Sequence, residues 1–102
     1  RKHPMSFSAD VARESLGRIL LRAHDRMRPD FADAPSDLDL TLEQNAAWDT
    51  YCAGRLARMG VRVNQQRWRY NHRNRFGFRD DVDAHFERIW AADDLGWDDL
   101  TS

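Results

Sequence analysis

Apolar side chains recur every three or four residues in the first third of the chain. Between Ser8 and Arg28 they form one stripe with the 3.6-residue period of an α-helix. The stripe consists of Ala12, Leu16, Ile19, Leu20, Ala23 and Met27. The Ser8 hydroxyl can cap the start of this helix, and Pro29 stops it. The pattern therefore predicts an amphipathic helix over residues 8–28.

A second helix is predicted over residues 42–59, after an acidic loop that contains two prolines. Thr41 and Gln44 have the spacing of a capping box, in which both side chains satisfy backbone amides at the start of a helix. Gly60 follows at the position where glycine often ends a helix. The apolar face of this helix is predicted to carry Trp48, Cys52, Leu56 and Met59, with Tyr51 beside them.

The last predicted helix covers residues 81–92, and Asp80 or Asp81 can cap its start. Its inward face is predicted to hold Val82, Phe86 and Ile89, with Trp90 at the edge. The acidic residues 93–102 follow as a tail. We expect this tail to fold back so that Trp97 covers the core, rather than to dock in the groove of a partner.

Residues 67–79, with the sequence RWRYNHRNRFGFR, fit two structures. As a helix from Asn64 to Phe76, the segment places Trp68, His72 and Phe76 on one face. As a β-hairpin, it alternates arginines with aromatic and other side chains at a period of two. The asparagines in the segment, and the absence of β-branched residues from it, favour the helix.

Together these elements predict a mostly α fold, a small bundle of three to four helices in a single domain over residues 8–92. A hairpin at about residues 67–79 would make the fold α+β instead. Residues 1–7 are expected to be a disordered tail or a remnant of an expression tag. With 102 residues, of which 41% are hydrophobic and 32% charged, the chain is large enough to bury a core.

The charges are segregated along the chain, although their formal sum is only −1. No acid lies between Asp49 and Asp80, and this interval contains eight arginines. Acidic residues crowd both flanks of the interval. Because surface ion pairs contribute only about 0–1 kcal/mol each, stability does not require this segregation. It favours a binding surface, and the competing interpretation is that the acidic flanks neutralise the arginines within the domain.

The interleaving of arginines and aromatics predicts contact with nucleic acid. Guanidinium groups bind phosphates through paired hydrogen bonds, and aromatic rings stack on unpaired bases. Asn71 and Asn74 can read base edges, and Tyr70 is the aromatic that points away from the Trp68 face. We therefore predict a non-enzymatic binding or regulatory module. Its predicted contact residues are Arg62, Arg67, Arg69, Tyr70, Arg73, Asn74, Arg75 and Arg79.

The alternative is a protein–protein interaction module, such as an adaptor, an antitoxin-like protein or a phage-type inhibitor, whose segregated charges meet an acidic protein partner. No catalytic or cofactor motif is visible, and Asp81 and His85, four residues apart, lack a third metal ligand on another element. No apolar run approaches the ~20 residues of a membrane span. The one cysteine, Cys52, is expected to be buried, which suits a cytoplasmic protein, and the excess of arginine over lysine suits a GC-rich bacterial or phage genome.

Overall fold

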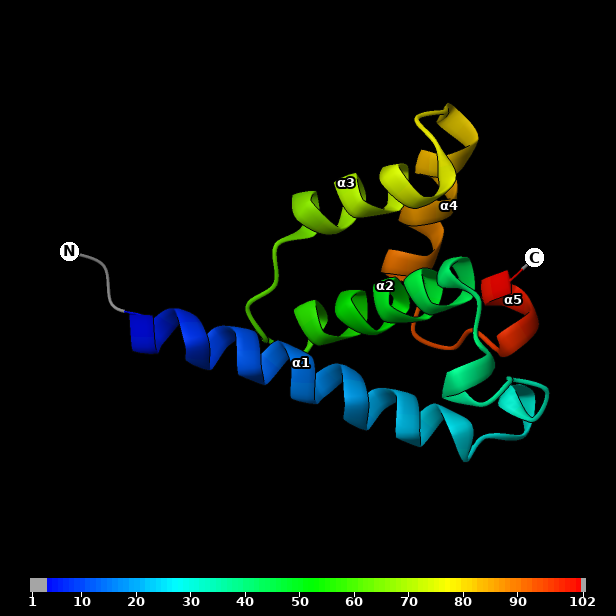
Figure 1. Cartoon of the computed structure of the whole chain (residues 1–102), viewed down its shortest axis with the longest axis horizontal. Helices are drawn as coiled ribbons and strands as arrows, with labels where there is room; N and C mark the ends of the chain where they lie inside the picture. Colours follow the sequence, from blue (N-terminus) through cyan, green and yellow to red (C-terminus); the bar gives the residue numbers. More distant parts are fainter. Residues whose placement is uncertain (1–3, 102) are drawn as a thin grey trace.

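The described chain is built from helices alone. The computed structural model describes the backbone of residues 4–101 and the side chains of residues 9–101. In this range there are five α-helices, two short 3-10 helices and no strand (Figure 1). The predicted mostly α class is confirmed, and the alternative hairpin at residues 67–79 is wrong because that segment is helical. The elements in chain order are α1 (Pro4–Arg26), η1 (Pro29–Phe31), η2 (Asp37–Asp39), α2 (Leu42–Arg58), α3 (Gln65–Phe76), α4 (Asp80–Ala91) and α5 (Trp97–Thr101).

Helix α2 is the centre of the arrangement, since α1, α3, α4 and α5 all contact it. Figure 1 shows α2 lying alongside α1 in the opposite direction, with α3 returning on the other side of α2. Helix α4 crosses behind α2 and α3 and lies close to α2 at Gly54, where a Cβ would collide with the carbonyl of Trp90. The first two long helices therefore pack antiparallel to each other.

The local signals that set the helix ends are mostly those predicted. The Thr41 hydroxyl accepts a hydrogen bond from the Gln44 backbone at 3.0 Å, and the Gln44 side chain accepts one from the Thr41 backbone at 2.9 Å. Gly60 and Gly77 follow α2 and α3 with φ values of 93° and 120°, a conformation that side chains with a Cβ disfavour. The capping box and the predicted stop at Gly60 are therefore confirmed, and Gly77 ends α3 in the same way.

Two predicted helix starts are wrong. Helix α1 begins at Pro4, so Ser8 lies within it rather than at its cap. Helix α4 begins at Asp80, and its N-cap residue is Arg79. The Arg79 backbone is extended, and its side chain makes no capping hydrogen bond. Asp80 and Asp81 lie instead in the first turn, where carboxylates interact favourably with the helix dipole. Residues 1–3 of the predicted N-terminal tail lie outside the described residues.

The core is an aromatic cluster between α2, η1 and α5. The ring of Trp48 packs against Phe31 and Trp97, each at a centroid distance of 5.3 Å. The Tyr51 hydroxyl accepts a hydrogen bond from the Leu95 backbone at 2.9 Å, which holds the segment before α5. The acidic C-terminal residues therefore fold back on the core, as predicted for Trp97. Cys52 is also buried, as expected, and burial raises the pKa of its thiol to about 12.

Helix α1 packs on α2 through a face that carries several charged residues as well as Gly17 and Leu21. Asp25 is completely buried, and its two carboxylate oxygens accept hydrogen bonds from Arg55 at 3.0 and 2.7 Å. The indole nitrogen of Trp48 donates to the same carboxylate at 2.9 Å. One turn away, Arg22 donates to Asn45 and Asp49. Charged side chains therefore occupy the surface that an amphipathic helix normally fills with apolar ones.

The apolar stripe of α1 consequently faces solvent. Leu16, Ile19, Leu20 and Met27 are between 56% and 84% exposed, and Ala12 and Ala23 are exposed as well. This orientation is opposite to that of an ordinary amphipathic helix in a globular domain. Met59, predicted on the buried face of α2, is also exposed, because α2 ends at Arg58 and Met59 belongs to the cap.

We expect the Asp25→Ala substitution to lower the free energy of unfolding by about 3–5 kcal/mol, because it leaves the Arg55 charge buried without its carboxylate partner. Asp37→Ala is the matched control, since Asp37 is exposed and binds Arg22 and Arg26 at the surface. Its expected cost is about 0–1 kcal/mol. Urea denaturation of both variants measures the difference, and equal costs would contradict the structural role of Asp25.

Candidate functional site

Two of the predicted contact arginines join α3 to α4. The Arg73 guanidinium makes two hydrogen bonds to Asp83, at 2.8 and 2.9 Å, and Arg69 forms an ion pair with Glu87. Residues four apart lie on the same side of a helix, so the Arg69 and Arg73 pair on α3 matches the acidic pair on α4. The result is a ladder of two ion pairs between antiparallel neighbours.

Other arginines of the acid-free interval also have carboxylate partners. Arg79 contacts Asp81 at 3.0 Å, and the highly exposed Arg62 lies 3.6 Å from Asp10. The remaining pairs are Arg55 with Asp25 and Arg58 with Asp93. Six of the eight arginines between Asp49 and Asp80 are therefore paired within the domain. For four of the six, the partner lies in the acidic flank that follows the interval, as that interpretation expected. Arg55 and Arg62 pair instead with acids of α1.

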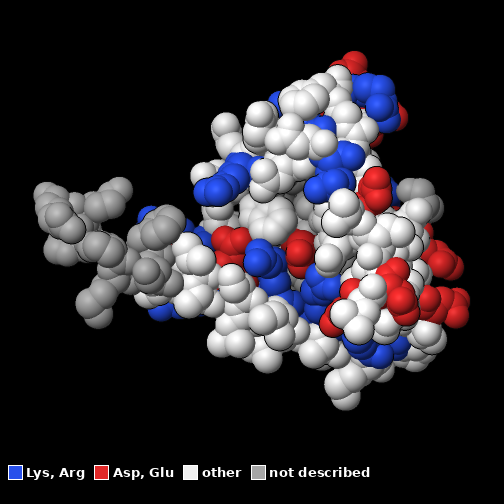
Figure 2. Space-filling view, viewed as in Figure 1, with Lys and Arg blue, Asp and Glu red and all other residues white. Residues whose placement is uncertain are grey.

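The predicted contact residues do not form one surface. Arg69 and Arg73 face α4, Arg62 lies in the loop before α3, and Arg79 lies in the turn before α4. The outward side of α3 brings together Arg67, Tyr70 and Asn74, all exposed, with Arg75 beside them. Figure 2 accordingly shows blue groups separated by white and red atoms rather than a continuous basic patch.

The outward side of α3 keeps its positive charge. Neither Arg67 nor Arg75 has an ion pair with any acid in the described part of the chain. Tyr70 is more than half exposed and meets Phe78 edge to face at 6.1 Å. Asn71, which was not among the predicted contact residues, is exposed on the same side. We call Arg67, Tyr70, Asn71, Asn74 and Arg75 the α3 face.

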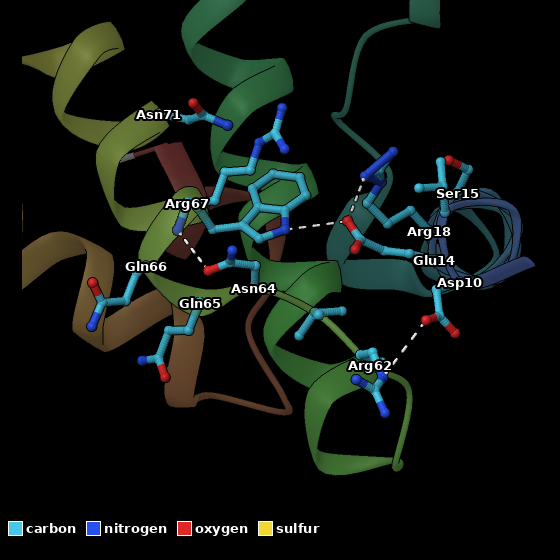
Figure 3. Close-up of a pocket in the computed structure, with 13 residues that line it drawn as sticks. Asp10, Glu14, Ser15, Arg18, Arg62, Asn64, Gln65, Gln66, Arg67 and Asn71 are labelled. Carbon is cyan, nitrogen blue, oxygen red and sulfur yellow. Dashed lines mark hydrogen bonds and ion pairs between the residues drawn. The ribbon is translucent and has the colours of Figure 1, made fainter. Parts of the chain in front are cut away.

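A cleft of about 850 Å³ lies between the N-terminal halves of α1 and α3. Trp68 lines it, and its indole nitrogen donates to Glu14 at 3.2 Å, while Arg18 lies 5.2 Å from the ring centroid. Figure 3 shows Glu14 and Arg18 reaching from α1 toward α3, with Asp10 and Arg62 paired at the opposite edge. The cleft thus presents both signs of charge: Glu14 and Asp10 are each held by a neighbouring side chain, and Arg67 lines the α3 side without an ion pair to a described acid.

His72 and His85 form a buried pair between α3 and α4. The Nε2 atom of His72 lies 3.1 Å from Nδ1 of His85, and the His72 ring packs on Phe76. Burial lowers the pKa of His72 to about 4, and it also lowers the pKa of His85. His72 is therefore a core histidine rather than a base-stacking one. His85 and Asp81, weighed as metal ligands, have separate partners, and no metal-binding cluster occurs among the described side chains.

Sequence reasoning missed the outer surface of α1, which we call the α1 stripe: Ala12, Leu16, Ile19, Leu20 and Ala23 of the helix, with Met27 in the turn directly after it. The three acids of this helix, Asp10, Glu14 and Asp25, are all engaged on its other sides. Figure 2 shows mostly uncharged atoms along the lower edge of the molecule, which α1 forms. The signal available in the sequence was the row of charged residues opposite the stripe, spaced to pair with α2.

We expect the free energy of unfolding to fall as the pH is lowered from about 6.5 to about 4. The folded-state pKa of His72, about 4, lies below that of an accessible histidine, so the unfolded chain takes up the proton first. Its contribution is complete above pH ~6.5 and is lost toward pH 4, up to about 3 kcal/mol. Urea denaturation across this range measures the loss.

The matched substitutions are His72→Gln, which we expect to flatten the pH dependence, and His24→Gln at an exposed position, which should leave it unchanged. Asp81 and Asp83 do not interfere, because hydrogen bonds from Arg79 and Arg73 lower their pKa values, so their contributions disappear only below the 3.8 of a free carboxyl group. Identical pH profiles for both variants would exclude the buried imidazole as the cause.

Comparisons with known proteins identify no relative from which a function can be carried over. The chain matches no protein-family model, no curated protein and no solved structure. Among the described helices, none combines the length and apolar composition needed to cross a bilayer. The α1 stripe and the α3 face are therefore judged by their own chemistry.

Proposed function

We propose that this chain is a non-enzymatic interaction module that binds a protein surface through the α1 stripe. The observation that supports it is the solvent exposure of Leu16, Ile19, Leu20 and Met27 on one side of a long helix. Monomeric soluble proteins rarely leave a contiguous apolar patch uncovered unless it serves binding. Covering each of these partly exposed side chains contributes roughly 1–2 kcal/mol to association.

The charges of the domain support a protein partner over a polyanion. Six of the eight arginines in the acid-free interval are paired with carboxylates of the same chain, so few remain to release counterions from a nucleic acid. The protein-interaction alternative raised by the sequence thus gains support, although its contact surface is the apolar α1 stripe rather than the segregated charges.

Replacing Leu20 with a photocrosslinking amino acid tests this function in a cell extract. We expect it to form covalent adducts with protein, because the position lies in the middle of the α1 stripe. The same amino acid at Phe78, at the tip of the α3–α4 turn, is the control with matched exposure, 65% against 60% for Leu20. Adducts from neither position, or equally from both, would contradict the proposal.

A second candidate function, nucleic-acid contact, is supported by the α3 face alone. Helix α3 contains no acid, and Arg67 and Arg75 extend from a surface that also carries Tyr70, Asn71 and Asn74. Arginine and asparagine are the side chains that pair with guanine and adenine edges, and tyrosine stacks on bases. The small number of available charges predicts weak binding with a modest salt dependence.

For nucleic-acid binding, we expect Arg67→Ala/Arg75→Ala to reduce the slope of log affinity against log salt by about 2 for duplex DNA, since each lost phosphate contact removes about 0.9. Arg69→Ala/Arg73→Ala removes the same charge from side chains already bound to Glu87 and Asp83, so its effect should be smaller. Titration of labelled oligonucleotides at several salt concentrations gives both slopes. No binding at low salt, or equal effects of the two variants, would remove this candidate.

A further inference from the structure

The α1 stripe has an internal symmetry that bears on the identity of its partner. Its six residues are arranged in pairs about the midpoint between Ile19 and Leu20. Ala12 and Met27 are equally distant from that midpoint, and so are Leu16 and Ala23. Each outer pair combines a small side chain with a large one. The positions of the stripe are therefore symmetric about the midpoint, and each outer small side chain has a large one at the equivalent position. An antiparallel copy of the helix would place these small side chains opposite large ones.

Building on the proposed function, we infer that the protein covering the α1 stripe is a second copy of this chain, packed with its α1 antiparallel about a twofold axis between Ile19 and Leu20. Such an interface is isologous, since each copy offers the same surface to the other. In this arrangement Leu16 of each copy faces Ala23 of the other. Ile19 and Leu20 meet their own symmetry mates and form the central layer.

The dimensions of α1 fit this packing. Ala12 and Met27 lie fifteen residues apart, which is about 22 Å along a helix axis. On a helical wheel the stripe spans roughly 100°, the width of the apolar face that a helix buries. Because Ala12 and Ala23 add little bulk, the two helices can approach to the ~8–10 Å typical of packed pairs.

The charges beside the stripe do not oppose self-association. The carboxylates of Asp10, Glu14 and Asp25 are engaged on the other sides of α1, so no two acids are brought together. Arg22 and Arg26 are held by Asp37, which neutralises the flank of the C-terminal half. An antiparallel copy therefore covers apolar surface without burying an unpaired charge.

The area that the two α1 stripes can bury sets the expected affinity of the dimer. A helix face about 22–34 Å long and about 10 Å wide buries a few hundred Å² per copy, below the ~800 Å² per partner of a standard interface. Leu38, which is 97% exposed, follows the Asp37 that Arg22 and Arg26 bind. The dimer is accordingly a reversible one that depends on concentration.

Sedimentation velocity of the purified full chain over a range of concentrations tests the inference. We expect the mass to rise from 12.0 kDa toward twice that value, and Leu20→Glu to weaken the association at least about tenfold because it places two carboxylates together at the axis. Leu42→Glu, at a position 63% exposed outside the stripe, is the control. A mixture of Leu20→Glu and Leu20→Lys proteins should recover the dimer, because opposite charges then meet.

Disulfide trapping tests the orientation. Proteins carrying Leu16→Cys and Ala23→Cys should form a mixed disulfide when combined and none when each is oxidised alone, since only the antiparallel twofold places residue 16 beside residue 23. The native Cys52 is buried and does not compete. Disulfides within each single variant, but none between the two, would indicate a parallel pair and overturn the proposed arrangement.

The remaining outcomes separate this inference from the proposed function. A chain that stays monomeric overturns the dimer, and so does a dimer that Leu20→Glu leaves unchanged. If the monomeric chain still forms protein adducts from position 20 in the cell extract, the interaction function stands with a different partner. Binding to phosphatidylglycerol vesicles that Leu20→Glu abolishes, without a dimer in solution, would identify the stripe as a membrane-surface helix and overturn both.

Discussion

The buried contact of Asp25 with Arg55 and Trp48 determines how α1 sits on the rest of the protein. Removing a carboxylate and a guanidinium from water costs several kcal/mol for each ion, and only close, multiply hydrogen-bonded geometry offsets that cost. Asp25 meets this condition with three hydrogen bonds, and the Arg55 guanidinium also lies 3.8 Å from the centroid of the Tyr51 ring. Because Arg55 and Trp48 belong to the buried side of α2, α1 must turn Asp25 inward, and the opposite side, with Leu16 and Leu20, is directed to solvent.

A related constraint explains the charge segregation along the chain. Helix α3 contains no acid, and α4 opens with three, yet in space Arg73 meets Asp83 and Arg69 meets Glu87. Runs of one sign on neighbouring antiparallel helices are what such a ladder requires. Partly exposed pairs contribute little to stability, about 0–1 kcal/mol each, so their main effect is to fix the register of α4 on α3. The fold thus accounts for most of the charge segregation. Arg67 and Arg75 have no ion pair with a described acid and are available to a ligand.

The sequence predicted those features that depend on neighbours along the chain. The Thr41–Gln44 capping box, the glycine after α2 and the helical period of α3 act within a few residues, and all of them were predicted correctly. The side of α1 that is buried depends on Arg55, thirty residues away, and a hydrophobic pattern carries no information about a buried ion pair. Which of the predicted contact arginines are paired with acids likewise depends on the register between α3 and α4. A helical wheel of α3 was enough to single out Tyr70, whereas the sequence could not show that Arg69 and Arg73 are occupied.

A helix with a charged inner side and an apolar outer side has two surfaces that need partners, and a single chain supplies only one. The inner side of α1 fixes the position of the helix on α2, because the Asp25 carboxylate must lie where it accepts hydrogen bonds from Arg55 and Trp48. The outer side gains most of its free energy only when water is removed from it. Figure 1 shows the N-terminal turns of α1 extending beyond the ends of the other helices. One side of α1 thus docks on α2 within the chain, and the opposite side offers apolar surface for association with another molecule. The same helix therefore connects folding with the proposed assembly.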